Sequence, residues 1–349
     1  MRTFHFPKQG VGNISLIDGN DGHSERYVNQ DKPIWTVKAA DLVRVPVTRD
    51  GIVMLTLSTQ AQTAPDLMKQ IPTQGIDCLT LGLLSMSQDE VEITDKCLAQ
   101  VGRFNKLQYL IVDSSDASDH GLKAVEGLKN LRGISISATR INGSCFKSFA
   151  KLPDLRQVVA QRCNFDESNF AYLSKCPRLE KLDLRWSNIS PKGLQFLVGC
   201  NSLYNLHLTK EKSRGDAMAV VLGRMRQLKH LHLNDTDTTD RGVESLSSLP
   251  VLEELCLNHT KVTDSCISSI KKMKKINNLG FVGTSVTEKG LLQLRGLKLT
   301  RVIASRELLT PAFRARMHLV FPAVNWELPN DSPITTDEIN YLADPSSAK

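Results

Sequence analysis

The sequence lacks several patterns from which a function is commonly inferred. Its eight cysteines include no C-x-x-C pair, which argues against a zinc ribbon or a thioredoxin-like site. It has no run of about 18 apolar residues, so we expect no membrane span. The first ten residues, MRTFHFPKQG, contain no apolar core of the kind that signal peptides have. Cysteines spaced singly along such a chain are typical of reduced, structural thiols, and we therefore expect a cytoplasmic protein.

The sequence also lacks the motifs of common enzymes. It contains no G-x-S-x-G, no P-loop and no H-E-x-x-H motif, and no G-x-G-x-x-G stands between a strand and a helix. Only about 50 residues precede the repeats described below and about 45 follow their last strand, too few for an independent enzyme domain. We therefore predict that the protein is not an enzyme and that it needs no cofactor.

The charge balance is only mildly basic. The 44 Lys and Arg residues exceed the 37 Asp and Glu residues by 7, which by itself does not indicate a nucleic-acid partner. The run KKMKK at 271–275 makes the C-terminal third more basic, but a charge run on a helix is usually a solvated face. The aromatic residues that stack on single-stranded nucleic acid are missing there. Binding of RNA is therefore a minor alternative.

Most of the chain follows a 24-residue repeat. The pattern L-x-x-L-x-L, with other apolar residues at some positions, recurs at spacings of 23 to 25 residues, and such a period is typical of solenoid proteins. Two segments, IVMLTL at 52 and IDCLTL at 76, extend it upstream. The gap of 31 residues that follows them predicts an insertion near 83–90. The other segments begin at residues 107, 131, 155, 179, 203, 228, 252, 276 and 299.

Each repeat continues with the pattern of a short helix. Apolar residues recur at i, i+3 and i+6, which forms one hydrophobic stripe. A Ser or Thr precedes the stripe as an expected N-cap, and an Asp or Glu often follows, where the helix dipole favours negative charge. Each unit is therefore predicted to be a strand, a turn and a helix, stacked so that the strands form a parallel sheet on the inner, concave side. The expected N-caps are Ser118, Ser190, Thr239, Thr263 and Thr287.

The turns of these units carry the motif T-x-[IV]-[ST]-D-x-G-L, as in TKVTDSCISSIKKM (260–273) and TSVTEKGLLQLRGL (284–297). With this motif, residues 52–305 resemble the leucine-rich-repeat family, in the subtype found in bacterial proteins and in the substrate-receptor parts of F-box proteins. The resemblance implies an α/β fold, a curved solenoid with helices on its convex side, which usually binds another macromolecule. The unit from 203, with TKEKSRGDAMAVVL, departs from the motif, and we expect a distorted turn there.

The ends of the chain are predicted to close the solenoid. Residues 1–51 contain FHF, NISLI and ADLVRVPV, which alternate like strands, and we expect a β-rich N-terminal cap over the first repeat. We find no F-box helices among them. Residues 52–328 form the predicted solenoid, in which PAFRARMHLVFPAVNWEL (311–328) supplies a closing helix and strand. Residues 329–349 are predicted to be a flexible tail.

The outward side chains of the strands define the candidate site. Strand residues alternate faces, so the third, fifth and seventh residues of each unit point to the concave side. The segments LYNLHL, LKHLHL and LEELCL then place His207, His232 and Cys256 in one row across neighbouring strands. The candidate partner-binding residues in and beside these rows are Lys181, Asp183, Arg185, Trp186, His207, His230, His232, Asn234, Glu254, Asn258 and His259.

Three interpretations of this surface are open. Solenoids present an extended concave wall, and Trp and Arg are enriched at binding hot spots, so we predict a recognition surface for a protein or peptide. A solvated polar face is the plain alternative. The third is a zinc or copper site, although the spacing matches no established metal motif and side chains on adjacent parallel strands are expected to diverge. The candidate ligands for such a site are His207, His230, His232 and Cys256.

Two further hypotheses concern what such a recognition surface does. The resemblance to F-box-associated repeats implies, as an alternative, that the protein is the substrate-receptor subunit of a ubiquitin-ligase-like or effector complex. Histidines at an interface titrate near pH ~6.5, so a pH-dependent affinity is a further hypothesis. The sequence does not name the partner.

Overall fold

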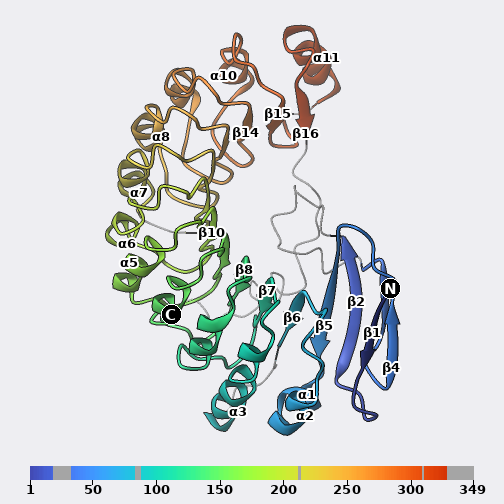
Figure 1. Cartoon of the computed structure of the whole chain (residues 1–349). Helices are drawn as coiled ribbons and strands as arrows, with labels where there is room; N and C mark the ends of the chain where they lie inside the picture. Colours follow the sequence, from blue (N-terminus) through green and yellow to red (C-terminus); the bar gives the residue numbers. More distant parts are fainter. Residues whose placement is uncertain (19–32, 83–87, 211–213, 309, 328–349) are drawn as a thin grey trace.

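The computed structural model shows a curved solenoid whose inner wall is a sheet and whose outer wall is a row of short helices (Figure 1). It describes residues 1–18, 33–82, 88–210, 214–308 and 310–327. Each repeat adds one strand to the inner wall, and helices are wider than strands, so the stack curves with its strands inside. The predicted fold class, an α/β leucine-rich-repeat solenoid with a parallel concave sheet, is confirmed.

Among the described residues, 14 strands form one continuous sheet. From β5 to β16, each strand pairs in parallel with the next, and equivalent residues of successive repeats lie opposite one another. The repeat leucines point into a continuous core between sheet and helices, where Leu182, Leu206 and Leu255 are at most 1% exposed. Burial of one such side chain contributes about 1.5–3 kcal/mol. These strands are β5 (Gly51–Leu57), β6 (Cys78–Thr80), β7 (Tyr109–Ile111), β8 (Gly133–Ser135), β9 (Gln157–Val159), β10 (Lys181–Asp183), β11 (Asn205–His207), β12 (His230–His232), β13 (Glu254–Cys256), β14 (Asn278–Gly280), β15 (Arg301–Ile303) and β16 (Asn325–Glu327).

The helices of the outer wall are mostly one or two turns long, and some are 3₁₀ helices, named η. This length agrees with the single hydrophobic stripe predicted for each repeat, since each helix buries only that stripe against its neighbours. They are α1 (Thr59–Gln62), α2 (Pro65–Lys69), α3 (Gln88–Leu98), η1 (Val101–Arg103), η2 (Gly121–Gly127), α4 (Phe146–Phe149), η3 (Glu167–Asn169), α5 (Phe170–Leu173), α6 (Pro191–Gln195), α7 (Gly215–Leu222), α8 (Asp240–Leu246), η4 (Asp264–Cys266), α9 (Ile267–Ile270), α10 (Glu288–Leu292) and α11 (Pro311–Val320).

The predicted N-caps are confirmed in four repeats. The hydroxyls of Ser190, Thr239, Thr263 and Thr287 each accept a hydrogen bond from a backbone N–H of the first turn, at 3.2 to 3.4 Å. Ser118 differs. Its hydroxyl accepts a hydrogen bond from the backbone N–H of His120 at 3.1 Å. The helix of that repeat, η2, begins only at Gly121 and has no side-chain cap.

The acidic residues of these turns do more than the predicted interaction with the helix dipole. Asp240 accepts hydrogen bonds from the backbone N–H and the hydroxyl of Thr263 in the following repeat, at 2.8 and 2.7 Å. Asp264 accepts the same pair of bonds from Thr287, at 2.7 and 2.6 Å. We call this set the carboxylate ladder, because each of its carboxylates ties one repeat to the next. Its members are Asp95, Glu167, Asp216, Asp240 and Asp264.

The carboxylate ladder explains why the motif continues with a glycine. A Cβ atom on Gly290 would lie 2.0 Å from Asp264 Oδ1, and one on Gly242 would lie 2.5 Å from Asp216 Oδ1. Both glycines are helical, and neither has a positive φ. The small residue is therefore needed for the close approach of the carboxylate and not for an unusual backbone conformation.

The N-terminal segment consists of antiparallel strands. β1 (Arg2–His5) pairs with β4 (Leu42–Val45), and β2 (Gly12–Asp18) lies between β5 and β3 (Trp35–Lys38). The strands expected from FHF, NISLI and ADLVRVPV are therefore present. β5 belongs to this antiparallel part and also starts the parallel sheet, which ties the first repeat to the segment before it.

The expected closing helix and strand are present as α11 and β16. The division into 1–51, 52–328 and 329–349 stays a prediction. The tail at 329–349 lies outside the described residues, as do 83–87 of the predicted insertion and 211–213 of the predicted distorted turn. In the described part of that turn, α7 begins after Arg214 without a side-chain cap.

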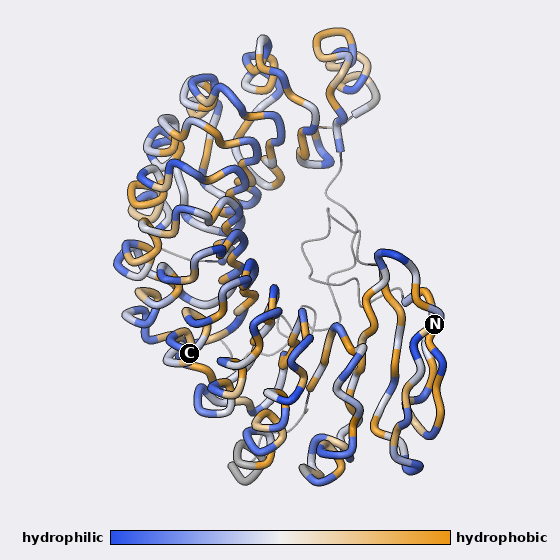
Figure 2. Tube along the Cα trace, in the orientation of Figure 1, coloured by the Kyte–Doolittle hydropathy of each residue, from blue (hydrophilic) through white to orange (hydrophobic). Residues whose placement is uncertain are grey.

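Hydrophobic and hydrophilic residues alternate around each coil of the solenoid, as Figure 2 shows. This alternation is expected when one side of every coil packs in the core. All eight cysteines are buried and free, in agreement with the prediction of structural thiols. Among the residues that the structure describes, no helix has the length and hydrophobicity that crossing a bilayer requires.

Candidate functional site

The predicted row of polar residues on the concave side is confirmed by the strand register. Asp183 lies opposite His207, His207 opposite His232, and His232 opposite Cys256. The row is not the solvated surface that outward positions suggest, however, because all four residues are at most 9% exposed. Neighbouring strands lie only about 4.8 Å apart, so side chains in one row cover one another.

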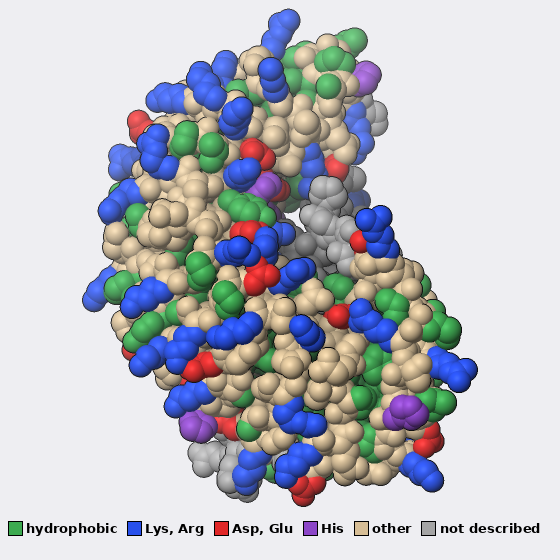
Figure 3. All heavy atoms as spheres, viewed as in Figure 1, with side chains coloured by type: hydrophobic (Ala, Val, Ile, Leu, Met, Phe, Trp, Pro, Cys, Tyr) green, Lys and Arg blue, Asp and Glu red, His purple; other side chains and the backbone are tan. Residues whose placement is uncertain are grey.

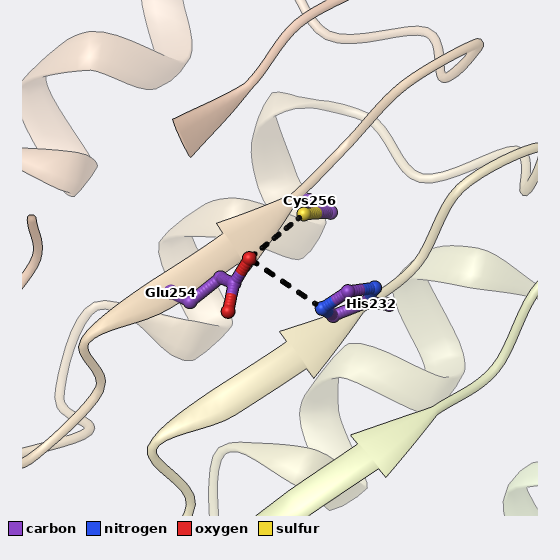
Figure 4. Close-up of side chains that lie close together, drawn as sticks. All are labelled: His232, Glu254 and Cys256. Atoms are coloured by element: carbon purple, nitrogen blue, oxygen red, sulfur yellow. Dashed lines mark hydrogen bonds and ion pairs between the residues drawn. The ribbon is translucent and has the colours of Figure 1, made fainter. Parts of the chain in front are cut away.

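One glutamate, Glu254, contacts His232 of this row and the neighbouring His230. The rings of His207 and His232 stack with centroids 3.9 Å apart. Glu254 reaches across from β13, with Oε2 at 3.0 Å from His230 Nδ1 and Oε1 at 3.7 Å from His232 Nε2. The Cys256 thiol donates to the same Oε1 at 3.7 Å (Figure 4). Glu254 thus joins two neighbouring strands.

The charges of this cluster are set by burial and by these contacts. Hydrogen bonds from His230 and His232 hold the pKa of Glu254 well below its usual range. Burial lowers the pKa of His207 well below its usual value, and the nearby His232 and Arg185 lower it further. His207 is therefore neutral at physiological pH and Glu254 is ionised. The buried Nδ1 atom of His207 has no hydrogen-bond partner within the described part of the chain.

The structure changes the set of candidate metal ligands. Of the predicted set, it brings together His232 and Cys256, and it adds Glu254, with one ligand atom from each residue within 4.8 Å of the others. His207 and His230 do not belong to this group. The expected divergence of side chains on adjacent strands is wrong here, because Glu254 is long enough to lean towards the neighbouring strand.

Trp186 lies at the edge of the sheet where the strands end, and it is surrounded by cations. The guanidinium of Arg162 lies 4.8 Å from the Trp186 ring centroid, Lys210 Nζ lies 5.5 Å from it, and the guanidinium of Arg185 lies 5.8 Å from it. Arg185 also forms an ion pair with Asp183, with Nη2–Oδ2 at 2.8 Å. The indole is half-buried beside a hollow of about 300 Å³ that Arg162 and Lys210 also line.

This arrangement depends on an unusual backbone conformation. Arg162, Trp186 and Lys210 have φ of 54°, 58° and 64°, in the left-handed region. Residues with a Cβ lose about 1–2 kcal/mol in this conformation. The turns after β7 to β14 share it, and equivalent residues are therefore presented in one column. The full column is Ser114, Ala138, Arg162, Trp186, Lys210, Asp235, His259 and Gly283.

Lys181 lies apart from Trp186. It stands at the opposite, amino-terminal edge of β10, where it lines a second hollow of about 400 Å³ with Arg156, Gln157 and Tyr204. The candidate residues of the sequence thus fall on two edges of the sheet with the buried histidine row between them. Figure 3 shows Lys and Arg side chains over the whole visible face, with acidic side chains among them along the inner rim.

Asn234 and Asn258 have a structural role on this surface. Asn234 Oδ1 accepts from the Asn258 backbone N–H, and Asn258 Oδ1 accepts from the Val282 N–H, both at 2.9 Å. Asp113 Oδ1 accepts in the same way from the Ser137 N–H at 2.7 Å, and burial raises the pKa of Asp113 above its ordinary value. We call Asp113, Asn234 and Asn258 the Asx ladder.

The exposed His259 lies beside Gly283, where a Cβ would be 2.3 Å from the imidazole Nδ1. The 24-residue spacing places Arg162 and Lys210 in the same turn position as Trp186, just beyond the concave rows. The candidate site residues predicted from the sequence did not include these two cations.

The comparison with protein families agrees with the repeat architecture. A family model described as Leucine Rich repeat matches residues 175–198. Solved structures that match include an internalin from Listeria monocytogenes, with 12% sequence identity, a TM-score of 0.43, and coverage of 77% of this chain and 86% of the internalin chain. No curated protein matches the sequence. The chain contains leucine-rich repeats, and its similarity to F-box-associated repeats stays a prediction.

Proposed function

We propose that the protein is a non-enzymatic scaffold that binds a protein or peptide on its concave face. The observation that carries the proposal is Trp186, a half-buried indole with three cationic side chains within 6 Å of its ring. Trp and Arg are the residues most enriched among binding hot spots. The repeat fold supports the proposal, because a solenoid offers one continuous wall to an extended ligand.

The chemistry of the Trp186 edge favours an acidic partner. Arg162, Arg185 and Lys210 bring three positive charges close to the same ring, and Arg185 forms an ion pair with Asp183. A carboxylate of a partner would form charge-assisted hydrogen bonds with such cations, and these bonds are roughly twice as strong as neutral ones. The hollow beside the indole has room for a side chain of the partner. Lys181 and Arg156 at the opposite edge would extend the contact to a longer ligand.

The first experiment is affinity capture from the native cell extract, followed by calorimetry with the recovered partner. We expect Trp186→Ala to weaken the affinity about 30-fold, because truncation of a hot-spot residue costs about 2 kcal/mol or more. Lys210→Glu is expected to weaken it as well. The matched control is Phe196→Ala, which removes an exposed aromatic side chain of the same repeat from the helix side.

Two results would argue against the proposal. If Trp186→Ala binds the partner as tightly as wild type, the Trp186 edge is not the recognition surface. If the recovered partner is RNA, with an affinity that falls steeply with salt, the minor alternative from the sequence takes precedence. Recovery of ubiquitin-ligase subunits would support the substrate-receptor role, which is one use of such a surface.

A further inference from the structure

We propose that His232, Glu254 and Cys256 form a binding site for one zinc ion on the concave face. The inference is independent of the proposed protein-binding function, which is carried by Trp186 on a different part of the sheet. The three residues come from two adjacent strands, β12 and β13, and their side chains point towards one another (Figure 4).

The spacing of the ligand atoms fits a tetrahedral ion. Glu254 Oε1 lies 3.7 Å from His232 Nε2 and 3.7 Å from Cys256 Sγ. The third separation, between nitrogen and sulfur, is at most 4.8 Å. Zinc–ligand bonds of about 2.0–2.3 Å at tetrahedral angles place such atoms about 3.4–3.6 Å apart. A small inward movement of side chains alone would therefore complete the geometry.

The donor set selects zinc over the hard cations. Calcium and magnesium take oxygen ligands, whereas an imidazole, a thiolate and a carboxylate together suit zinc. In the metal-free protein the Cys256 thiol donates a hydrogen bond to Glu254. On zinc binding the thiol proton is released to solvent, and the sulfur binds as the thiolate.

The charge balance also favours the ion. The bound site would contain a dication, one thiolate, one carboxylate and a neutral imidazole, so its net charge is zero. That matters because His232 and Cys256 are at most 9% exposed, and an uncompensated charge there would be costly. Three protein ligands leave the fourth tetrahedral position to a solvent molecule, as in zinc sites with an open position.

His230 supports the site without being a ligand. Its Nδ1 atom is hydrogen-bonded to Glu254 Oε2 at 3.0 Å, which leaves Oε1 for the ion and fixes the carboxylate. The loss of such a supporting partner typically weakens metal affinity about 10–100-fold. His230→Ala is therefore expected to weaken binding within that range and to keep the same ligand set, which distinguishes a positioning residue from a ligand.

Cobalt(II) is the probe for the test, because cobalt bound by a thiolate gives a ligand-to-metal charge-transfer absorption that carboxylate or imidazole alone does not. The purified full-length chain is treated with a chelator under reducing conditions and titrated with Co²⁺. We expect one equivalent to produce the thiolate band, zinc to displace it, and zinc to raise the thermal midpoint. Cys256→Ser should abolish the band, and His232→Ala and Glu254→Gln should weaken cobalt binding at least 10-fold.

The matched control for the thiol is Cys163→Ser. Cys163 occupies the turn position that is serine at Ser187 in the next repeat, so this change is tolerated by the fold and should leave the band intact. Trp186→Ala should leave it intact as well, so failure of the metal site and failure of the protein-binding proposal are separable. No thiolate band with wild-type protein, or an unchanged band in Cys256→Ser, would overturn the inference. Because the wild-type titration and the isosteric Glu254→Gln do not depend on a disruptive change, the result holds even if another variant unfolds.

Discussion

The contact between Asp264 and Gly290 allows a test of how neighbouring repeats are held together. Asp264 accepts two hydrogen bonds from Thr287 of the next repeat. Hydrogen bonds to charged groups contribute about 1.5–3 kcal/mol each when well shielded. Thr287 is exposed, so water replaces part of what is lost, and we expect Asp264→Ala to lower the free energy of unfolding by about 1.5–2 kcal/mol in total.

Gly290→Ala should act on the same bonds from the other side. The new Cβ would lie 2.0 Å from Asp264 Oδ1, so the carboxylate must rotate away and both bonds are lost. Alanine gains about 0.5–1 kcal/mol over glycine within a helix, which leaves a net loss of about 0.5–1.5 kcal/mol. In the Asp264→Ala background the clash is largely removed, and Gly290→Ala is expected to stabilise the protein instead. The coupling energy of the double-mutant cycle should therefore be about 1.5–2 kcal/mol.

The assay is urea unfolding, followed by circular dichroism and by tryptophan fluorescence to check that the transitions coincide. Gly127→Ala is the control, because no atom lies within 4 Å of its added Cβ, and it should not destabilise the protein. Additive effects of the two substitutions, or a stabilising effect of Gly290→Ala in the wild-type background, would refute the reasoning.

Three further predictions follow from other features. Folding raises the pKa of Asp113 above its ordinary value of 3.8, so this carboxyl lowers the stability of the protein at neutral pH and not at pH values below 3.8. Asp113→Asn keeps the acceptor oxygen of the Asx ladder. The unfolding midpoint of this variant in urea should exceed that of wild type at pH 7, and the difference should shrink as the pH falls. A variant less stable than wild type at pH 7 would contradict this. Ala138→Gly should raise the free energy of unfolding in the same assay by about 0.5–1 kcal/mol, because Ala138 has φ of 53° and glycine adopts the left-handed region without steric cost. No gain would mean that the turn is not strained. Burial raises the pKa of five thiols to about 12, namely those of Cys78, Cys97, Cys176, Cys200 and Cys266. Peptide mapping after alkylation at pH 8 should therefore find these thiols unmodified in the native protein and modified in guanidinium. Rapid labelling of the native protein would instead show that these core positions open.

The repeat period made the positions of the strands predictable, and with them the register of the concave rows. Because every repeat has nearly the same length, a count along the sequence places His207 opposite His232, as the structure does. The N-caps were predictable for the same reason, since a hydroxyl just before an apolar stripe lies next to the unpaired backbone N–H groups of the first helical turn.

Interactions between repeats were not predictable from the pattern within one repeat. The acid after each N-cap matches the helix dipole in its own unit, yet Asp240 and Asp264 accept hydrogen bonds from the next unit. Glu254 was predicted as a surface residue, and only the path of its side chain shows that it reaches His232 on the neighbouring strand. The burial of the histidine row likewise depends on how side chains of adjacent strands cover one another, which the sequence does not state.

The two ladders give the molecule a direction. In the carboxylate ladder and the Asx ladder, the acceptor belongs to the earlier repeat and the donors belong to the later one. On the ribosome, each emerging repeat therefore meets acceptors that are already in place. In these two ladders, a chain cut after a repeat leaves carboxylate and amide oxygens exposed, which water satisfies readily, whereas a fragment that starts in the middle leaves backbone N–H groups without their acceptors. The backbone hydrogen bonds of the sheet are lost by a cut from either side. Fragments shortened from the carboxyl end should therefore fold better than fragments of equal length shortened from the amino end.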